Sequence, residues 1–192
     1  MTKKTILILF IFGVVFLLSA CKDDETTIPG SGMSSGFRFS TTAFEDGAVI
    51  PVKYSCDGSN LCPKLEWSGM PEGTKSFAII IDDPDAVPVA GYVWDHWLIC
   101  NIPSSVTSIA EGSTALNIGA LGGISLKNSF GNFNYGGPYP PPDQNHKYEF
   151  EIYALDVTQL PGVNSSSSKV HLESTLSAHT LEKVVFTGTF EH

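Results

Sequence analysis

Two short stretches of this chain carry most of the side chains that are suited to binding or acid–base chemistry. Asp83 and His96 belong to the first stretch, and His146 and Tyr148 belong to the second, which lies much further along the chain. A fold that brings the stretches together places two imidazoles, a carboxylate and a phenol in one small volume. That set is sufficient to orient a small polar ligand. We expect a single pocket if the fold makes these distant segments meet; taken alone, His96 and His146 would be interpreted as ordinary structural histidines.

The imidazoles are the natural anion-binding groups here, because Arg38 is the only arginine in the chain. A neutral imidazole offers one donor and one acceptor, and a protonated one offers two donors and a positive charge. His96 and His146 could therefore share the oxygens of a phosphate-like or carboxylate group. A carboxylate at Asp83 would fix the tautomer of one histidine and favour its cationic form. The hydroxyl of Tyr148 would add a further donor.

A glycine-rich loop, Gly136-Gly137-Pro138, precedes the second stretch. Because glycine tolerates unusual dihedrals, we expect the backbone N–H groups of Gly136 and Gly137 to form an anion-binding nest. Around Pro84 we expect Asp82 to cap the turn. For Asp85 two roles are equally consistent with the sequence, a cap of the turn and a ligand-binding side chain.

Two tryptophans flank the first histidine, and their positions alternate with those of the expected pocket residues. For Trp94 and Trp97 we favour core packing over stacking on a ligand. His171, His179 and His192 have no motif around them and are interpreted as ordinary structural or surface residues.

The first stretch begins where a buried strand ends. Residues 76–81 are apolar and partly β-branched and stop at Asp82-Asp83-Pro84, a pattern typical of a central strand buried on both faces. Residues 147–155 alternate apolar and polar side chains, which predicts a strand with one wet face. Further strands are predicted at residues 37–40, 65–67, 94–102 and 184–190.

Helices are expected to be a minority. Residues 172–183 have an apolar stripe that includes Leu172 and Leu176, with Ser174 as the expected cap. Residues 104–133 are read as a long surface connection with one short helix at 114–121. The fold class predicted is mainly β, or α+β in some schemes: antiparallel sheets packed as a sandwich with one or two peripheral helices.

The N-terminus predicts export. Lys3 and Lys4 precede an apolar run at residues 6–18 that is too short for a permanent membrane span of about 20 residues. The tetrad Leu18-Ser19-Ala20-Cys21 resembles a bacterial lipobox, which implies cleavage before Cys21, diacylglycerol on its sulfur and an acyl chain such as palmitate on the new N-terminus. The alternative is an ordinary secretory signal that leaves Cys21 unmodified.

These features divide the chain into a lipoprotein signal peptide at 1–20, a flexible tether at 21–36 and a folded domain at 37–192. Several acyl chains would hold the mature protein stably on a membrane, on its periplasmic face or at the cell surface. The acidic residues just after Cys21 resemble a signal for transfer to the outer surface, and are equally consistent with a solvated start to the tether.

Charge and cysteine usage narrow the possible partners. The chain has 11 basic and 20 acidic residues, and removing Lys3 and Lys4 would change its net charge from −9 to −11, so nucleic acid is not an expected partner. Cys56 and Cys62 are interpreted either as a short-loop disulfide or as two free thiols. No spacing resembles a structural zinc site, and we expect no cofactor or resident metal ion.

Several segments, taken in order, resemble the signature blocks of the phosphatidylethanolamine-binding proteins, in particular their bacterial Raf-kinase-inhibitor-like branch. The blocks are Asp83-Pro84-Asp85-Ala86, Trp94-Asp95-His96-Trp97, Asn101-Ile102-Pro103, Gly136-Gly137-Pro138 and His146-Lys147-Tyr148. The resemblance implies a β sandwich with a small anion pocket. It assigns Asp83, His96, His146 and Tyr148 to the pocket, and Pro84, Trp94, Gly137 and Pro138 to its walls.

The resemblance also has departures and leaves functional alternatives. Asp95 stands where animal relatives tend to have a second histidine, and Tyr139 where bacterial relatives often have cysteine; both changes could alter the shape or charge of the pocket. The function expected is a non-catalytic, membrane-tethered module that binds a small anion or phospholipid headgroup and regulates or inhibits an unknown protein partner. The alternatives are a phosphoester hydrolase using metal or acid–base catalysis, and a host-facing interaction protein that uses surface loops.

Overall fold

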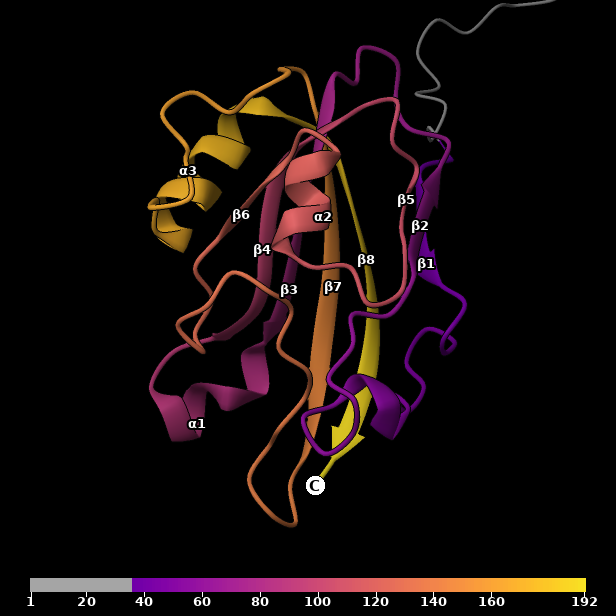
Figure 1. Cartoon of the computed structure of the whole chain (residues 1–192), viewed down its shortest axis with the longest axis vertical. Coiled ribbons are helices and arrows are strands. Elements are labelled where there is room, and N and C mark those ends of the chain that lie inside the picture. The colour runs from indigo at the N-terminus through magenta and orange to yellow at the C-terminus, as the bar shows by residue number, and fades with distance from the viewer. Residues whose placement is uncertain (1–35) are drawn as a thin grey trace, which may run out of the picture. The chain divides into compact units, whose positions relative to one another are not determined.

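The computed structural model describes residues 36–192. The predicted signal peptide, the lipidation site at Cys21 and all but the last residue of the predicted tether lie outside this range. Within it, eight strands form two sheets in which all neighbouring strands are antiparallel, as Figure 1 shows. The prediction of a mainly β fold with packed antiparallel sheets is confirmed. No helix in residues 36–192 is long and apolar enough to span a bilayer.

The smaller sheet has the order β1-β2-β5 and the larger sheet has the order β6-β4-β3-β7-β8. The strands in chain order are β1 (Arg38–Thr41), β2 (Leu65–Ser68), β3 (Ser76–Asp83), β4 (Trp94–Pro103), β5 (Ser108–Ile109), β6 (Ile124–Leu126), β7 (Asn145–Leu155) and β8 (Thr180–Glu191). The helices are α1 (Val87–Ala90), α2 (Ala115–Ala120) and α3 (Lys169–His179), with short 3₁₀ turns η1 (Val52–Tyr54) and η2 (Pro84–Ala86).

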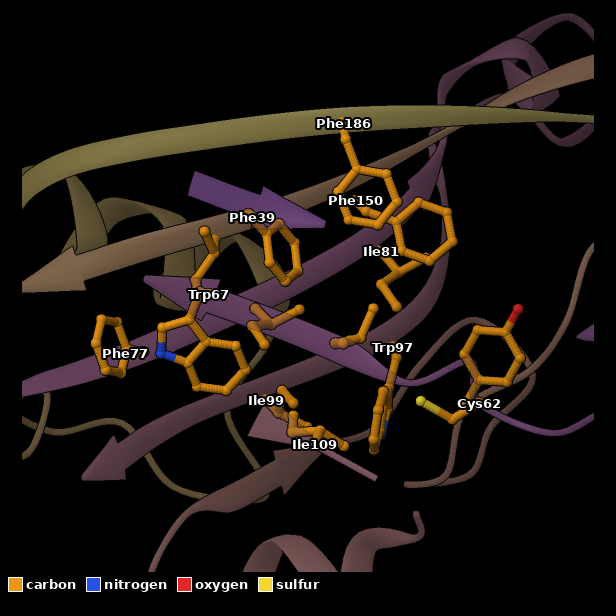
Figure 2. Packing of buried hydrophobic residues seen from close by; sticks show 14 of the residues in the cluster. Phe39, Cys62, Trp67, Phe77, Ile81, Trp97, Ile99, Ile109, Phe150 and Phe186 are labelled. Atoms are coloured by element: carbon orange, nitrogen blue, oxygen red, sulfur yellow. The ribbon is translucent and has the colours of Figure 1, made fainter. Parts of the chain in front are cut away.

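An aromatic core fills the space between the two sheets (Figure 2). Trp67 of β2 packs edge-on against Phe77 of β3 with ring centroids 5.4 Å apart. Phe39 of β1 meets Phe186 of β8 at 5.0 Å, and Phe186 stacks on Phe150 of β7 at 4.7 Å. Such aromatic pairs add to the stabilisation from buried apolar area. The short strands β1 and β2 are therefore stabilised by aromatic packing against the larger sheet.

A second apolar cluster covers the other face of the larger sheet. Ala78 and Ile80 of β3 pack with Leu172 and Leu176 of α3. All eight residues of β3 are buried, which confirms the prediction of a central strand covered on both faces.

The predicted wet face of β7 is wrong over its second half. Glu151 is buried, accepts a hydrogen bond from the Tyr153 hydroxyl, and lies 2.5 Å from the Lys183 ammonium. The polar residue that the alternating pattern presents as solvent exposed is thus a buried carboxylate, held by the tyrosine hydroxyl and by a lysine whose side chain reaches the surface.

The long connection at residues 104–133 is more ordered than its sequence indicates. The short predicted helix is confirmed as α2, with Thr114 and Asn117 in a capping box. The connection also contains β5 and β6, whose two and three residues are too short to produce a recognisable period.

Helix α3 begins three residues before the predicted start and ends at His179, where the chain enters β8. Its N-cap is Ser168, whose Oγ accepts a hydrogen bond from the His171 N–H. Ser174, the cap expected from the sequence, lies inside the helix. Propensity and pattern place helix ends only approximately, because the cap residue is defined by backbone geometry.

We expect Ser168→Ala to lower the free energy of unfolding by about 1 kcal/mol, because it leaves the His171 N–H without its cap. Ser174→Ala is the matched control and should change stability by less than about 0.5 kcal/mol. Urea denaturation measures both changes. Equal losses in the two variants would contradict the observed helix start.

The strand arrangement brings the predicted site together. Strand β3 lies between β4 and β7 and is antiparallel to both. The last residues of β3 therefore lie beside the first residues of β4 and β7. Asp83 pairs with Trp94 in this register, and Asp82 pairs with Glu149. The two motifs that are distant in sequence consequently meet at one end of the larger sheet.

Candidate functional site

A pocket of about 370 Å³ opens at this end of the sheet. Of the residues predicted for the site, Asp83, Trp94, His96 and His146 line it. The remaining lining residues are Ala86, Val89, Ala90, Phe130, Tyr139, Pro140, Pro141, Pro142 and His192. The size lies within the range typical of small-molecule sites, and a few polar groups converge within mostly apolar walls.

His146 and Asp83 form a buried pair at the base of the pocket. The His146 Nδ1 lies 2.8 Å from Asp83 Oδ2, and the His146 Nε2 lies 3.1 Å from Oε1 of Gln144. Asp83 Oδ1 accepts from the Ala86 N–H at 3.0 Å, so the same carboxylate caps η2. Both ring nitrogens of His146 therefore have a side-chain oxygen within hydrogen-bond distance, and these two contacts fix the orientation of the ring.

His96 is almost completely buried and has one free ring nitrogen. Its Nδ1 donates to the Gly136 carbonyl at 2.6 Å, while its Nε2 has no hydrogen-bond partner among the described residues. Burial lowers the pKa of His96, although the Gly136 carbonyl opposes this shift. The ring is therefore neutral at pH 7, with a lone pair on Nε2.

Tyr148 lies behind His96 on β7. Its ring meets the His96 ring edge-on at 5.1 Å, and its buried hydroxyl has no hydrogen-bond partner among residues 36–192. Burial, followed by the negative charge of Asp83, raises the pKa of Tyr148, so the hydroxyl keeps its proton. His96 Nε2 and the Tyr148 hydroxyl thus both lack a hydrogen-bond partner within residues 36–192, and of these two residues His96 lines the pocket.

Other predicted residues lie next to the pocket without lining it. Pro84 is the first residue of η2. Asp85 Oδ2 accepts from the Lys147 N–H at 2.8 Å, which ties η2 to β7. Gly137 and Pro138 contact the loop after η1, where the Pro138 carbonyl accepts from the Cys56 N–H. These four residues support the segments around the pocket and do not line it.

The predicted anion nest is not formed. The Gly136 N–H donates to the His96 carbonyl at 3.1 Å, and the Gly137 N–H donates to Asn60 Oδ1 at 2.6 Å. Neither glycine has a positive φ. What the loop requires at Gly137 is space, because a Cβ there would lie 2.2 Å from the Tyr54 carbonyl oxygen.

Two acidic residues have different roles from those predicted. The turn after β3 is capped by Asp83, while Asp82 is ion-paired with Lys169. Asp95 is also paired with Lys169 and does not line the pocket. Adjacent residues on a strand point to opposite faces, so one position separates a pocket residue from one behind it.

Sequence reasoning missed the histidine at the pocket mouth. His192 Nδ1 lies 3.0 Å from Asp57 Oδ2, and its ring meets Tyr139 edge-on at 4.8 Å. The signal that could have located it is strand pairing, because His146 of β7 pairs with Phe190 of β8. Without that register, His192 has no motif to mark it.

The three cysteines within residues 36–192, Cys56, Cys62 and Cys100, are free thiols. Cys56 Sγ donates to the Gly137 carbonyl and Cys62 Sγ to the Pro63 carbonyl, so the alternative of a disulfide between them is not realised. Cys100 is buried in the core, as expected. Within the described part of the chain, no three His, Cys, Asp or Glu side chains are grouped so as to hold a metal ion.

These features define a small two-sheet β protein with a histidine-lined pocket at one end of its larger sheet. The model of the phosphatidylethanolamine-binding protein family matches residues 40–191. The chain belongs to this family, in agreement with the sequence motifs.

Individual relatives support the same assignment. YbcL of Escherichia coli is 34% identical over 172 residues, covering 84% of this chain and 91% of that protein. Its crystal structure superposes with a TM-score of 0.74 over 81% of this chain and 98% of YbcL. The structure of the Chlamydia trachomatis homologue CT736 has a TM-score of 0.72 at 31% identity, over 83% of this chain and 99% of CT736. LppC of Mycobacterium tuberculosis, which is named as a candidate lipoprotein, is 38% identical over 150 residues, covering 77% of this chain and 69% of LppC.

Proposed function

We propose that this protein is a binding protein whose pocket holds a small organic anion, such as the phosphate or carboxylate of a headgroup. The observation that carries the proposal concerns His96, a residue that lines the pocket and whose buried Nε2 has no hydrogen-bond partner among the described residues. The Tyr148 hydroxyl is also unpartnered, and the His146 ring is held by Asp83. A ligand oxygen between these groups would accept a hydrogen bond from the Tyr148 hydroxyl, and from His96 Nε2 once that nitrogen has taken up a proton.

Binding without turnover is part of this proposal, and the contacts of Asp83 support it. The Asp83 carboxylate is engaged by both His146 and the Ala86 N–H. It is therefore poorly placed to accept a proton from a substrate. Incubation of the protein with a panel of phosphoesters and divalent metal ions tests this point. Product release that is abolished by a His96→Asn substitution would contradict it.

We also propose that the protein is an exported lipoprotein attached to a membrane through Cys21. Support comes from the lipobox-like tetrad and from the name of the relative LppC. Metabolic labelling with a fatty-acid analogue should label the wild-type chain and not a Cys21→Ala variant.

Regulation of a protein partner is a further part of the proposal. A partner protein that binds the wild-type chain and does not bind a His96 variant would support it.

Anion affinity is expected to rise as pH falls from 8 to 5. The pKa of His96 is lowered in the free protein, so the neutral ring offers only an acceptor at Nε2, whereas the protonated ring offers a donor and a charge. Binding an anion then takes up a proton, and affinity increases by up to about tenfold per pH unit between the pKa of His96 in the complex and its lower pKa in the free protein. Calorimetry with sulfate measures this, because its charge is constant over the range. An affinity independent of pH would contradict the role assigned to His96.

A further inference from the structure

Behind the pocket, two carboxylates face each other on neighbouring strands. Asp82 of β3 and Asp95 of β4 are cross-strand partners, and each is one residue away from a pocket residue, Asp83 or His96. Side chains alternate along a strand, so this pair lies on the opposite face of the sheet from the pocket. Like charges placed directly opposite one another destabilise a pair of strands.

One lysine bridges the two carboxylates. Lys169 is the first residue of α3, and its Nζ lies 2.5 Å from Asp82 Oδ2 and 2.8 Å from Asp95 Oδ1. Its side chain is only 15% exposed, so the pair is weakly screened by water. Burial alone would lower the pKa of Lys169, but Asp82 and then Asp95 raise it, and the ammonium keeps its charge.

The surrounding charges leave Lys169 as the main counterion. Burial raises the pKa of Asp82 to about 7 even with Lys169 beside it, so its charge is costly to hold. The other titratable groups around the cluster are Glu151 and Tyr153 of β7, Glu173 of α3 and Lys183 of β8. Lys183 is paired with Glu151, and Glu173 lies 3.8 Å from Lys169. Neither reduces the repulsion between Asp82 and Asp95.

We propose that Lys169 is a positioning residue for the pocket, because it holds the ends of β3 and β4 together from the opposite face of the sheet. Through Asp82 it fixes the next residue, Asp83, which holds the His146 ring. Through Asp95 it fixes His96. The relative placement of the two imidazoles then depends on a lysine that does not touch the ligand. The effect on ligand affinity rests on the function proposed above, whereas the effect on imidazole geometry does not.

The first test replaces the ammonium with an apolar chain of similar length in the full chain. Lys169→Met leaves two facing carboxylates, and we expect the ring nitrogen NMR signals of His96 and His146 to shift in the ligand-free protein. Sulfate affinity should fall about tenfold or more, equivalent to about 1.4 kcal/mol. Both effects should be larger at pH 8.5 than at pH 6, because at the lower pH Asp82 can take up a proton and hydrogen bond to Asp95.

A charge-balanced variant separates positioning from general loss of structure. Lys169→Met combined with Asp82→Asn and Asp95→Asn removes all three charges, and should restore the imidazole signals and bring sulfate affinity to within about threefold of the wild type. The matched control is Lys183→Met, which removes the neighbouring lysine and should leave the signals of His96 and His146 unchanged.

The outcomes distinguish the two proposals. Lys169→Met with wild-type imidazole signals at pH 8.5 would overturn the positioning role. A folded triple variant whose imidazole signals remain shifted would also overturn it. The triple variant therefore decides the question even if Lys169→Met alone does not fold. If the wild-type protein binds no sulfate, the proposed function fails, and the ligand-free imidazole spectra still decide the role of Lys169.

Discussion

A Gly137→Ala variant is expected to lose at least about 3 kcal/mol of unfolding free energy, or to fail to fold. The added Cβ would lie 2.2 Å from the Tyr54 carbonyl oxygen and 2.7 Å from Ser55 Cα. Both atoms belong to backbone, so no side-chain rotation relieves the overlap. The Gly137 N–H and carbonyl also bond to Asn60 and Cys56, so displacement of the loop breaks further contacts.

The matched control for this variant is Gly119→Ala in α2. A Cβ at Gly119 has open space around it, and alanine favours helix over glycine by about 1 kcal/mol. The control should be as stable as the wild type or more stable. Denaturation midpoints in urea measure both changes. A Gly137→Ala protein with wild-type stability would show that the loop does not make the close approach seen in the structure.

The second large effect is expected in ligand binding. His96→Asn should lower the affinity for a small anion about 10- to 100-fold, because a hydrogen bond to a charged group contributes about 1.5–3 kcal/mol. An asparagine amide occupies the position of the ring Nδ1 and can still donate to the Gly136 carbonyl. The group that is lost is Nε2, the buried nitrogen that has no hydrogen-bond partner in residues 36–192.

His96→Gln is the complementary variant. Its longer side chain places an amide near the position of Nε2 and loses the bond to Gly136. We therefore expect a stability loss of about 1–3 kcal/mol with part of the affinity retained. Calorimetry with phosphate, together with urea denaturation, separates the two properties. Equal affinity in His96→Asn and the wild type would remove His96 from the ligand-binding set.

Much of the architecture could be predicted because hydrophobic periodicity reflects burial directly. The apolar run at residues 76–81 identified the central strand, and the turn residues after it located its end. The assignment of Asp83, His96 and His146 to one pocket came from the family resemblance, and the structure explains it by the antiparallel pairing of β3 with β4 and β7. These features depend on local pattern and on one simple rule of sheet geometry.

The remaining features depend on three-dimensional register. Asp82 and Asp83 are chemically identical neighbours, and only the strand orientation decides which of them faces the pocket. His192 enters the site because β8 pairs with β7, a long-range contact that has no local signature. The buried Glu151 was predicted as exposed because its partner, Lys183, lies on another strand. Sequence periodicity shows which positions are polar, and does not show whether a polar side chain is exposed or buried beside a partner.

The most direct test of the anion pocket is a titration observed through the imidazole ring nitrogens. The chain has five histidines, so each ring can be followed separately. Phosphate, phosphoethanolamine and acetate should each produce saturable shifts at His96 and His146, and smaller shifts at His192, while His171 and His179 remain unchanged. A complete absence of shifts at His96 and His146, or equal movement of all five rings, would contradict the assignment of this pocket as the ligand site.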